Sequence, residues 1–175
     1  MKLVIINGSP RKKGRTGIAA RFITRKYNAE QLNINDLPLY NGEPEQAELP
    51  QIQRLRRIVK EADAVILASP EYHSGMSGAL KNALDFLGSE HFAHKPVALL
   101  AVAGGGKGGI NALNNMRVVA RGLYANAIPK QLVLDPHCFN YEENTLNDQS
   151  EEIVDEFVKE LITYTKIYQL VRNEE

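Results

Sequence analysis

The feature that most constrains the fold is an alternation of short apolar runs with segments of helical periodicity. The runs that are apolar at every position lie at 3–6, 64–68, 97–103 and 132–134, with a weaker strand candidate at 31–35. Helical periodicity marks 16–28, 51–62, 77–88, 111–121 and a long segment through 153–168. Strands that are apolar throughout are buried on both faces. The pattern therefore predicts an α/β fold, in which a doubly wound, five-stranded parallel sheet forms a three-layer α/β/α sandwich.

Length, charge and cysteine content exclude several classes of protein. The 175 residues fit a single domain, 1–175, and 21 basic residues balance 21 acidic ones. A zero net charge argues against nucleic acid or an anionic membrane as partner. The seven-residue apolar run 97–103 is too short to cross a bilayer, and 3–6 is too short for a signal peptide. Cys138 alone allows no disulfide framework and no cysteine-ligated metal cluster. We expect a soluble, cytoplasmic protein.

The loop at residues 8–17, after the first strand, has the composition of an anion site. It carries four cations, two hydroxyl groups and three glycines directly before a helix. Helix N-termini favour phosphate, and arginine binds it in bidentate fashion. We expect phosphate binding by Ser9, Arg11, Arg15 and Thr16. The alternative is a solvated turn in which Thr16 only caps the helix.

The loop at residues 69–78, after the third strand, is long and rich in groups that can face a flat polar ligand. The candidates in it are Pro70, Glu71, Tyr72, His73, Ser74 and Gly75. Taken singly, Tyr72 could simply pack in the core and His73 could be an ordinary surface histidine. Because ligands of doubly wound sheets bind beyond the carboxyl ends of the strands, we expect this loop to meet the same ligand as the first.

The glycine cluster at residues 104–109 follows the fourth strand. Its candidate binding residues are Gly104, Gly105, Gly106 and Gly109. The cluster matches GxGxxG literally, but the dinucleotide fingerprint belongs to the first strand of its fold. Close approach of the backbone to a flat ligand explains the glycines more simply.

Other nucleotide and catalytic motifs do not fit. Five residues separate Gly8 from Gly14, where a P-loop has four, and Arg15 stands in place of its lysine. There is no GxSxG nucleophile elbow and no His, Cys and Asp cluster for a metal. One phosphate-sized basic loop and two loops suited to a planar ring together favour flavin mononucleotide (FMN).

Three motifs carry a family resemblance. They are residues 7–12, residues 69–85 and residues 103–109. Over about residues 2–136 the chain resembles the NADPH-dependent FMN reductases of the flavodoxin-like fold, and especially bacterial azobenzene reductases. It departs from their pattern at Gly14, where the family has serine, and at His73, where many members have asparagine. Thr16 would then supply the missing hydroxyl.

The resemblance implies a ping-pong oxidoreductase with FMN and NADPH as cofactors. NADPH would reduce FMN at N5, and an azo compound, a quinone or free flavin would then take the electrons. The cofactor carries the chemistry, so no side chain is assigned a catalytic role. The resemblance, together with small residues on the 77–88 helix, implies a homodimer or homotetramer with FMN near the interface. The alternative is a flavodoxin-like FMN electron carrier without its own NADPH turnover. Flavodoxins are usually strongly acidic, unlike this neutral chain.

Overall fold

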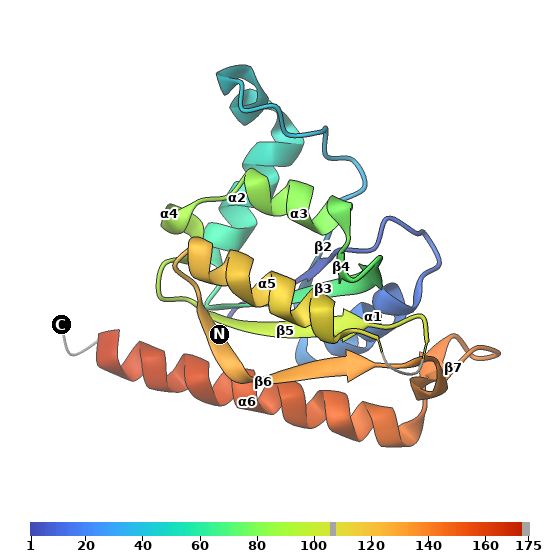
Figure 1. Ribbon diagram of the computed structural model, residues 1–175. Coiled ribbons are helices and arrows are strands. Elements are labelled where there is room, and N and C mark those ends of the chain that lie inside the picture. Colours follow the sequence, from blue (N-terminus) through green and yellow to red (C-terminus); the bar gives the residue numbers. More distant parts are fainter. Residues whose placement is uncertain (106–107, 173–175) are drawn as a thin grey trace.

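The computed structural model describes residues 1–105 and 108–172 (Figure 1). Its main sheet holds β1 Leu3–Asn7, β2 Glu30–Asn33, β3 Ala64–Tyr72, β4 Gly75–Met76, β5 Pro96–Val102 and β6 Asn126–Leu134. A separate small hairpin pairs β7 Phe139–Asn140 with β8 Thr145–Leu146. The helices are α1 Arg15–Tyr27, α2 Pro50–Glu61, α3 Gly78–Asp85, α4 Ser89–Phe92, α5 Ile110–Gly122 and α6 Asp148–Arg172. Short 3₁₀ turns lie at Pro44–Glu48 and Pro136–Cys138.

The sheet has the order β2-β1-β3-β5-β6, and every neighbouring pair along that path is parallel. The predicted five-stranded parallel sheet is therefore confirmed, with β4 added as a short antiparallel partner of β3. The chain steps outward from β1 to β2, then returns to place β3 on the other side of β1. This reversal puts the topological switch point, where such sheets bind ligands, at the carboxyl ends of β1 and β3.

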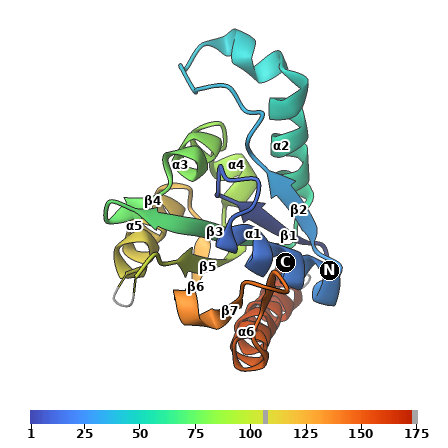
Figure 2. The same ribbon diagram turned by 90° about the vertical axis from the view of Figure 1, so that its right-hand side faces the viewer.

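Helices cover both faces of the sheet, as predicted. Figures 1 and 2 show α2, α3 and α5 on one face and α1 and α6 on the other. The buried side chains of β1 alternate between the two faces of the sheet. Val4 and Ile6 pack in the core under α2, α3 and α5, and Leu3 and Ile5 pack in the core under α1 and α6. Because each face has its own helix layer, the strands show no polar side and read as continuous apolar runs.

Two strands are longer than the sequence predicts. β3 continues beyond Ala68 through Pro70 to Tyr72, where a loop was expected. Its pairing with β1 ends at Asn7–Ala68, so Pro70 pairs only with β5 and its missing N–H breaks no ladder bond on the β1 side. β6 begins at Asn126, six residues before the predicted start, and includes Pro129. It is the edge strand of the sheet, where proline is tolerated.

The helices follow the predicted segments with two corrections. α3 ends at Asp85, and the rest of the predicted 77–88 helix forms the turn that leads to α4. Thr16 does not cap α1. The N-cap is Gly14, which has no side chain to cap with, and Thr16 lies buried within the first turn. None of the helices in the described part of the chain is both long enough and apolar enough to span a bilayer.

A buried carboxylate fastens α1 to α6. Asp155 accepts a hydrogen bond from the Tyr27 hydroxyl and forms ion pairs with Lys26, at 2.7 Å, and Lys159, at 2.5 Å. These donors hold the pKa of Asp155 well below its ordinary value. Burial and the neighbouring carboxylate raise the pKa of Tyr27. The layer formed by α1 and α6 is thus held by charge as well as by apolar packing.

Candidate functional site

A hollow of about 190 Å³ lies at the carboxyl edge of the sheet, beside the switch point. It is lined by Ser9, Arg11, Gly14, Arg15, Thr16, Pro70, Glu71, Tyr72, Val102 and Gly104. These residues come from the segments that follow β1, from the end of β3 and from the end of β5. The three segments predicted to share one ligand therefore do meet in space.

The first segment, between β1 and α1, is held in its turn by two hydrogen bonds from backbone amides to side chains. The Asn7 side-chain oxygen accepts from the Ser9 amide at 3.2 Å, and the Ser9 hydroxyl accepts from the Arg11 amide at 3.3 Å. A Cβ at Gly14 would lie 2.8 Å from the Ser9 hydroxyl, so a larger residue there would have to displace that hydroxyl. These two hydrogen bonds fix the turn from β1 into α1. The N-terminus of α1 has no side-chain cap and no acidic residue in its first turn.

The two arginines of this segment differ in what their guanidinium groups contact. Arg15 donates to the Tyr141 hydroxyl at 3.3 Å and lies 5.8 Å from the centre of the Phe139 ring. Arg11 is exposed at the hollow, and its guanidinium has no hydrogen-bond or ion-pair partner among the described residues. The structure thus leaves a free guanidinium and free helix N–H groups at one end of the hollow, which suits a phosphate.

The second segment is a hairpin and not the long loop expected. Glu71 pairs with Met76, and Tyr72 pairs with Gly75. His73 and Ser74 form the turn with φ of 48° and 63°, and both are exposed. A two-residue turn with both φ positive usually carries asparagine and glycine, so His-Ser gave no hairpin signal. The hairpin keeps Pro70, Glu71 and Tyr72 at the hollow and places His73 and Ser74 at its tip.

The third segment approaches other backbone closely at one position. Gly109 has φ of 95°, and a Cβ there would lie 2.5 Å from Val133 Cγ1. Among the described residues, a Cβ at Gly104 or Gly105 would meet nothing within 4 Å. A carboxylate oxygen of Glu71 accepts from the Ala112 amide of α5 at 2.9 Å, which ties this segment to β3.

Among the predicted binding residues, the structure brings together Ser9, Arg11, Arg15, Thr16, Pro70, Glu71, Tyr72 and Gly104. It leaves His73, Ser74, Gly75, Gly105 and Gly109 outside the lining, and Gly106 lies outside the described residues. Gly14 and Val102 line the hollow without having been predicted. The sequence analysis did not assign Asn7 the role of fixing the turn beside the hollow. An asparagine at a strand end before Gly-Ser is typical of a turn built on its side chain.

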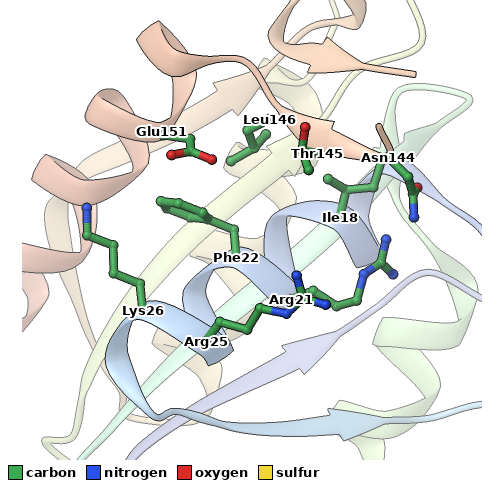
Figure 3. A pocket seen from close by; sticks show the side chains of 9 residues that line it. All are labelled: Ile18, Arg21, Phe22, Arg25, Lys26, Asn144, Thr145, Leu146 and Glu151. Carbon is green, nitrogen blue, oxygen red and sulfur yellow. The ribbon is translucent and has the colours of Figure 1, made fainter. Parts of the chain in front are cut away.

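A second hollow, of about 260 Å³, lies beside α1 and away from the glycine segment. Its lining includes Ile18, Phe22 and Leu146 as apolar side chains, with Arg21 and Arg25 at its border. Figure 3 shows the Phe22 ring pointing from α1 toward Leu146 and α6. This hollow shares no residue with the one at the sheet edge. It is therefore a separate feature of the layer formed by α1 and α6.

Comparison with known proteins identifies the family. The family described as NADPH-dependent FMN reductase matches residues 1–139, which include all three segments of the hollow. The chain belongs to the NADPH-dependent FMN reductase family. An NADPH azoreductase of Bacillus sp. (strain OY1-2) is 52% identical, over 99% of this chain and 98% of the relative. An FMN-dependent NADPH-azoreductase of Staphylococcus aureus (strain USA300) is 34% identical, over 75% and 76% of the two chains.

Solved structures support the flavodoxin-like fold. The flavoenzyme FerB of Paracoccus denitrificans, an NAD(P)H:(acceptor) oxidoreductase, superposes with a TM-score of 0.80 at 18% identity, over 95% of this chain and 98% of FerB. An archaeal flavodoxin gives 0.62 at 15% identity, over 97% and 99%. At such identities the likeness concerns the fold, and it confirms the flavodoxin-like architecture implied by the sequence motifs.

Proposed function

We propose that this reductase transfers electrons from NADPH through bound FMN to an azo compound, a quinone or a free flavin. The observation that carries the proposal is the uncapped, basic N-terminus of α1, which opens into a hollow shared with the ends of β3 and β5. The two azoreductase relatives support the same reaction for this chain. We also propose that this reductase is cytoplasmic.

The residues at the hollow fit FMN at both ends. The phosphate would be held by the N–H groups that begin α1, by the Arg11 guanidinium and by the hydroxyls of Ser9 and Thr16. Pro70 and Tyr72 offer apolar surface for the ring. When bound, FMN accepts hydride from NADPH and passes electrons to the second substrate. The chain positions the cofactor, so no side chain is given the role of acid, base or nucleophile.

The remaining cations suit the extra phosphate of NADPH. Lys12 and Lys13 are exposed next to Arg11, and neither takes part in an ion pair within the described chain. One FMN phosphate does not use all of this charge. We infer that the surplus favours the 2′-phosphate that distinguishes NADPH from NADH.

The proposal includes a homodimer or homotetramer. The α3 surface that the sequence marked is partly covered by this chain, since the Asn82 side chain bonds the Tyr40 amide and the Pro38 carbonyl, each at 2.8 Å. Outside that contact, Leu39 is 81% exposed and Gly78 has open space beside it. Leu39 and the neighbouring Tyr40, which is 44% exposed, give this loop an apolar surface, and we infer that the subunit contact lies there.

The test is a two-step reduction. Protein loaded with FMN is mixed with NADPH in a stopped-flow instrument without oxygen, and the loss of flavin absorbance at 450 nm is followed. A quinone is then added and recovery of the absorbance at 450 nm is measured, and in a parallel run with an azo dye the loss of the dye's own absorbance is followed. Rapid reduction and reoxidation support the proposal. Bound FMN that NADPH does not reduce would indicate an electron carrier instead.

A further inference from the structure

Among the helices that begin at the carboxyl edge of the sheet, α1, α3 and α5 differ in how their N-termini are capped. Each would offer free N–H groups and partial positive charge to an anion. The N-terminus of α3 is closed by its own cap, because the Ser77 hydroxyl accepts from the Leu80 amide at 3.0 Å. Neither α1 nor α5 has such a cap, since Gly14 and Gly109 occupy the cap positions.

Glu71, which lies in β3, caps the N-terminus of α5. One oxygen of its carboxylate accepts from the Ala112 amide at 2.9 Å, across 41 residues of sequence. The other lies against Gly108, where a Cβ would come within 3.3 Å of it. α5 has no acid in its own first turn, so Glu71 supplies the negative charge that this helix end favours. Glu71 also belongs to the lining of the hollow.

We propose that Glu71 is a positioning residue that caps α5 in place of a cap within that helix. The cap would hold the segment after β5 against β3, on the side of the hollow away from Arg11. It would also fill the anion site of α5 and leave the α1 terminus to the phosphate. This inference rests on the proposed FMN site, and it differs from the sequence-based expectation that Glu71 itself contacts the cofactor.

The two ends of the hollow can be probed separately, because riboflavin has the ring of FMN without the phosphate. A residue that acts at the phosphate end changes FMN binding and leaves riboflavin binding unchanged. A residue that positions the ring end changes both by the same factor. Glu71 should belong to the second kind, and Arg11 to the first.

The experiment measures dissociation constants of FMN and riboflavin by flavin fluorescence, using apoprotein of the wild type, Glu71→Ala and Glu71→Gln. We expect Glu71→Ala to weaken both ligands about tenfold, as loss of a charge-assisted bond would. Glu71→Gln should recover most of the affinity, because its amide oxygen can still accept from Ala112. Glu152→Ala, an exposed glutamate on α6, serves as the control and should change neither constant.

Hydrogen exchange of the unliganded proteins gives a readout that needs no flavin. The amides of residues 109–113 should exchange faster in Glu71→Ala than in Glu71→Gln. Unchanged binding in Glu71→Ala, a loss confined to FMN, or Glu71→Gln as weak as Glu71→Ala would overturn the inference. If Glu71→Ala does not fold, Glu71→Asp replaces it, because the shorter carboxylate does not reach Ala112. A wild type that binds no flavin would reject the proposed function, while the exchange data would still test the cap.

Discussion

The Ser77 hydroxyl donates to the carbonyl of Gly8 at 2.5 Å and so joins the segments after β1 and β3 across 69 residues. The same oxygen accepts from the Leu80 amide and caps α3. Gly8 must be glycine at this junction, because a Cβ there would lie 2.6 Å from the Ala68 carbonyl. This buried hydrogen bond therefore holds the segment after β1 against the start of α3.

The first prediction concerns this junction. Ser77→Ala removes the α3 cap and the donor to Gly8, so we expect the free energy of unfolding to fall by about 2 kcal/mol. Urea unfolding followed by circular dichroism measures the change. Ser74→Ala, at the exposed hairpin tip, should stay within about 0.5 kcal/mol of the wild type. Equal stability of the two variants would contradict the structural role of Ser77.

The second prediction concerns the phosphate. Arg11→Ala should weaken FMN roughly 10- to 100-fold by loss of a charge-assisted contact, and leave riboflavin unchanged. Arg15→Ala should have a smaller effect, because Tyr141 and Phe139 already engage that guanidinium. Fluorescence titration measures both, with Arg25→Ala on the far part of α1 as control. Full FMN affinity in Arg11→Ala would assign the phosphate to Arg15 or the lysines.

The third prediction concerns the choice of nicotinamide. NADPH should have a higher kcat/KM than NADH, and replacing both Lys12 and Lys13 by alanine should reduce the ratio by raising the KM for NADPH. Initial rates with each nucleotide measure the ratio, and Lys166→Ala on α6 is the matched control. Equal kcat/KM values in the wild type would refute a role for the surplus cations.

The fourth prediction concerns assembly. Light scattering at micromolar concentration should give two or four times the chain mass of 19.5 kDa. Leu39→Glu should shift the mass toward the monomer, since a charge would then be buried in the contact. Leu170→Glu, which alters a leucine that is 66% exposed on α6, should leave the mass unchanged. A wild-type mass near 19.5 kDa would reject the shared interface.

The fifth prediction concerns pH. The pKa of Asp155 is lowered from 3.8 on folding, so its contribution to stability is full above about pH 4 and is lost as the pH falls further. The pKa of Tyr27 is raised from 10.0, so its contribution is full below about pH 10 and is lost as the pH rises. Asp155→Asn should flatten the acid side of the stability profile, and Tyr27→Phe the alkaline side. Thermal melts across a range of pH measure both effects. If the stability profiles of the variants ran parallel to that of the wild type, these two groups would not contribute to the pH dependence of folding.

The architecture could be predicted because apolar periodicity records it directly. Runs such as 97–103 are typical of strands covered by helices on both faces, and the glycines and cations after the strands indicated the edge where the hollow lies. The extension of β3 was missed because Pro70 reads as a strand terminator. Only the register between β1 and β3 shows that β1 has already ended before Pro70. A proline is read correctly only when its neighbours in the sheet are known.

The candidate site was predicted in composition but not in detail. Local signals located Arg11, Tyr72 and Gly104, since each lies within a few residues of a strand end. No local signal indicated that Glu71 turns toward Ala112, or that Ser77 reaches Gly8, because these bonds join residues 41 and 69 positions apart. Long-range bonds depend on the packed sheet, and the sequence of one segment does not specify them.

The contacts among Asn7, Ser9 and Arg11 have a consequence for the rate and entropy of binding. They are made within the chain itself, so the turn into α1 is ordered before any ligand arrives. The conformational entropy of that turn is then lost during folding and not during association. Such a preorganised cradle should bind without an induced-fit step, and the observed rate of FMN uptake should rise linearly with FMN concentration.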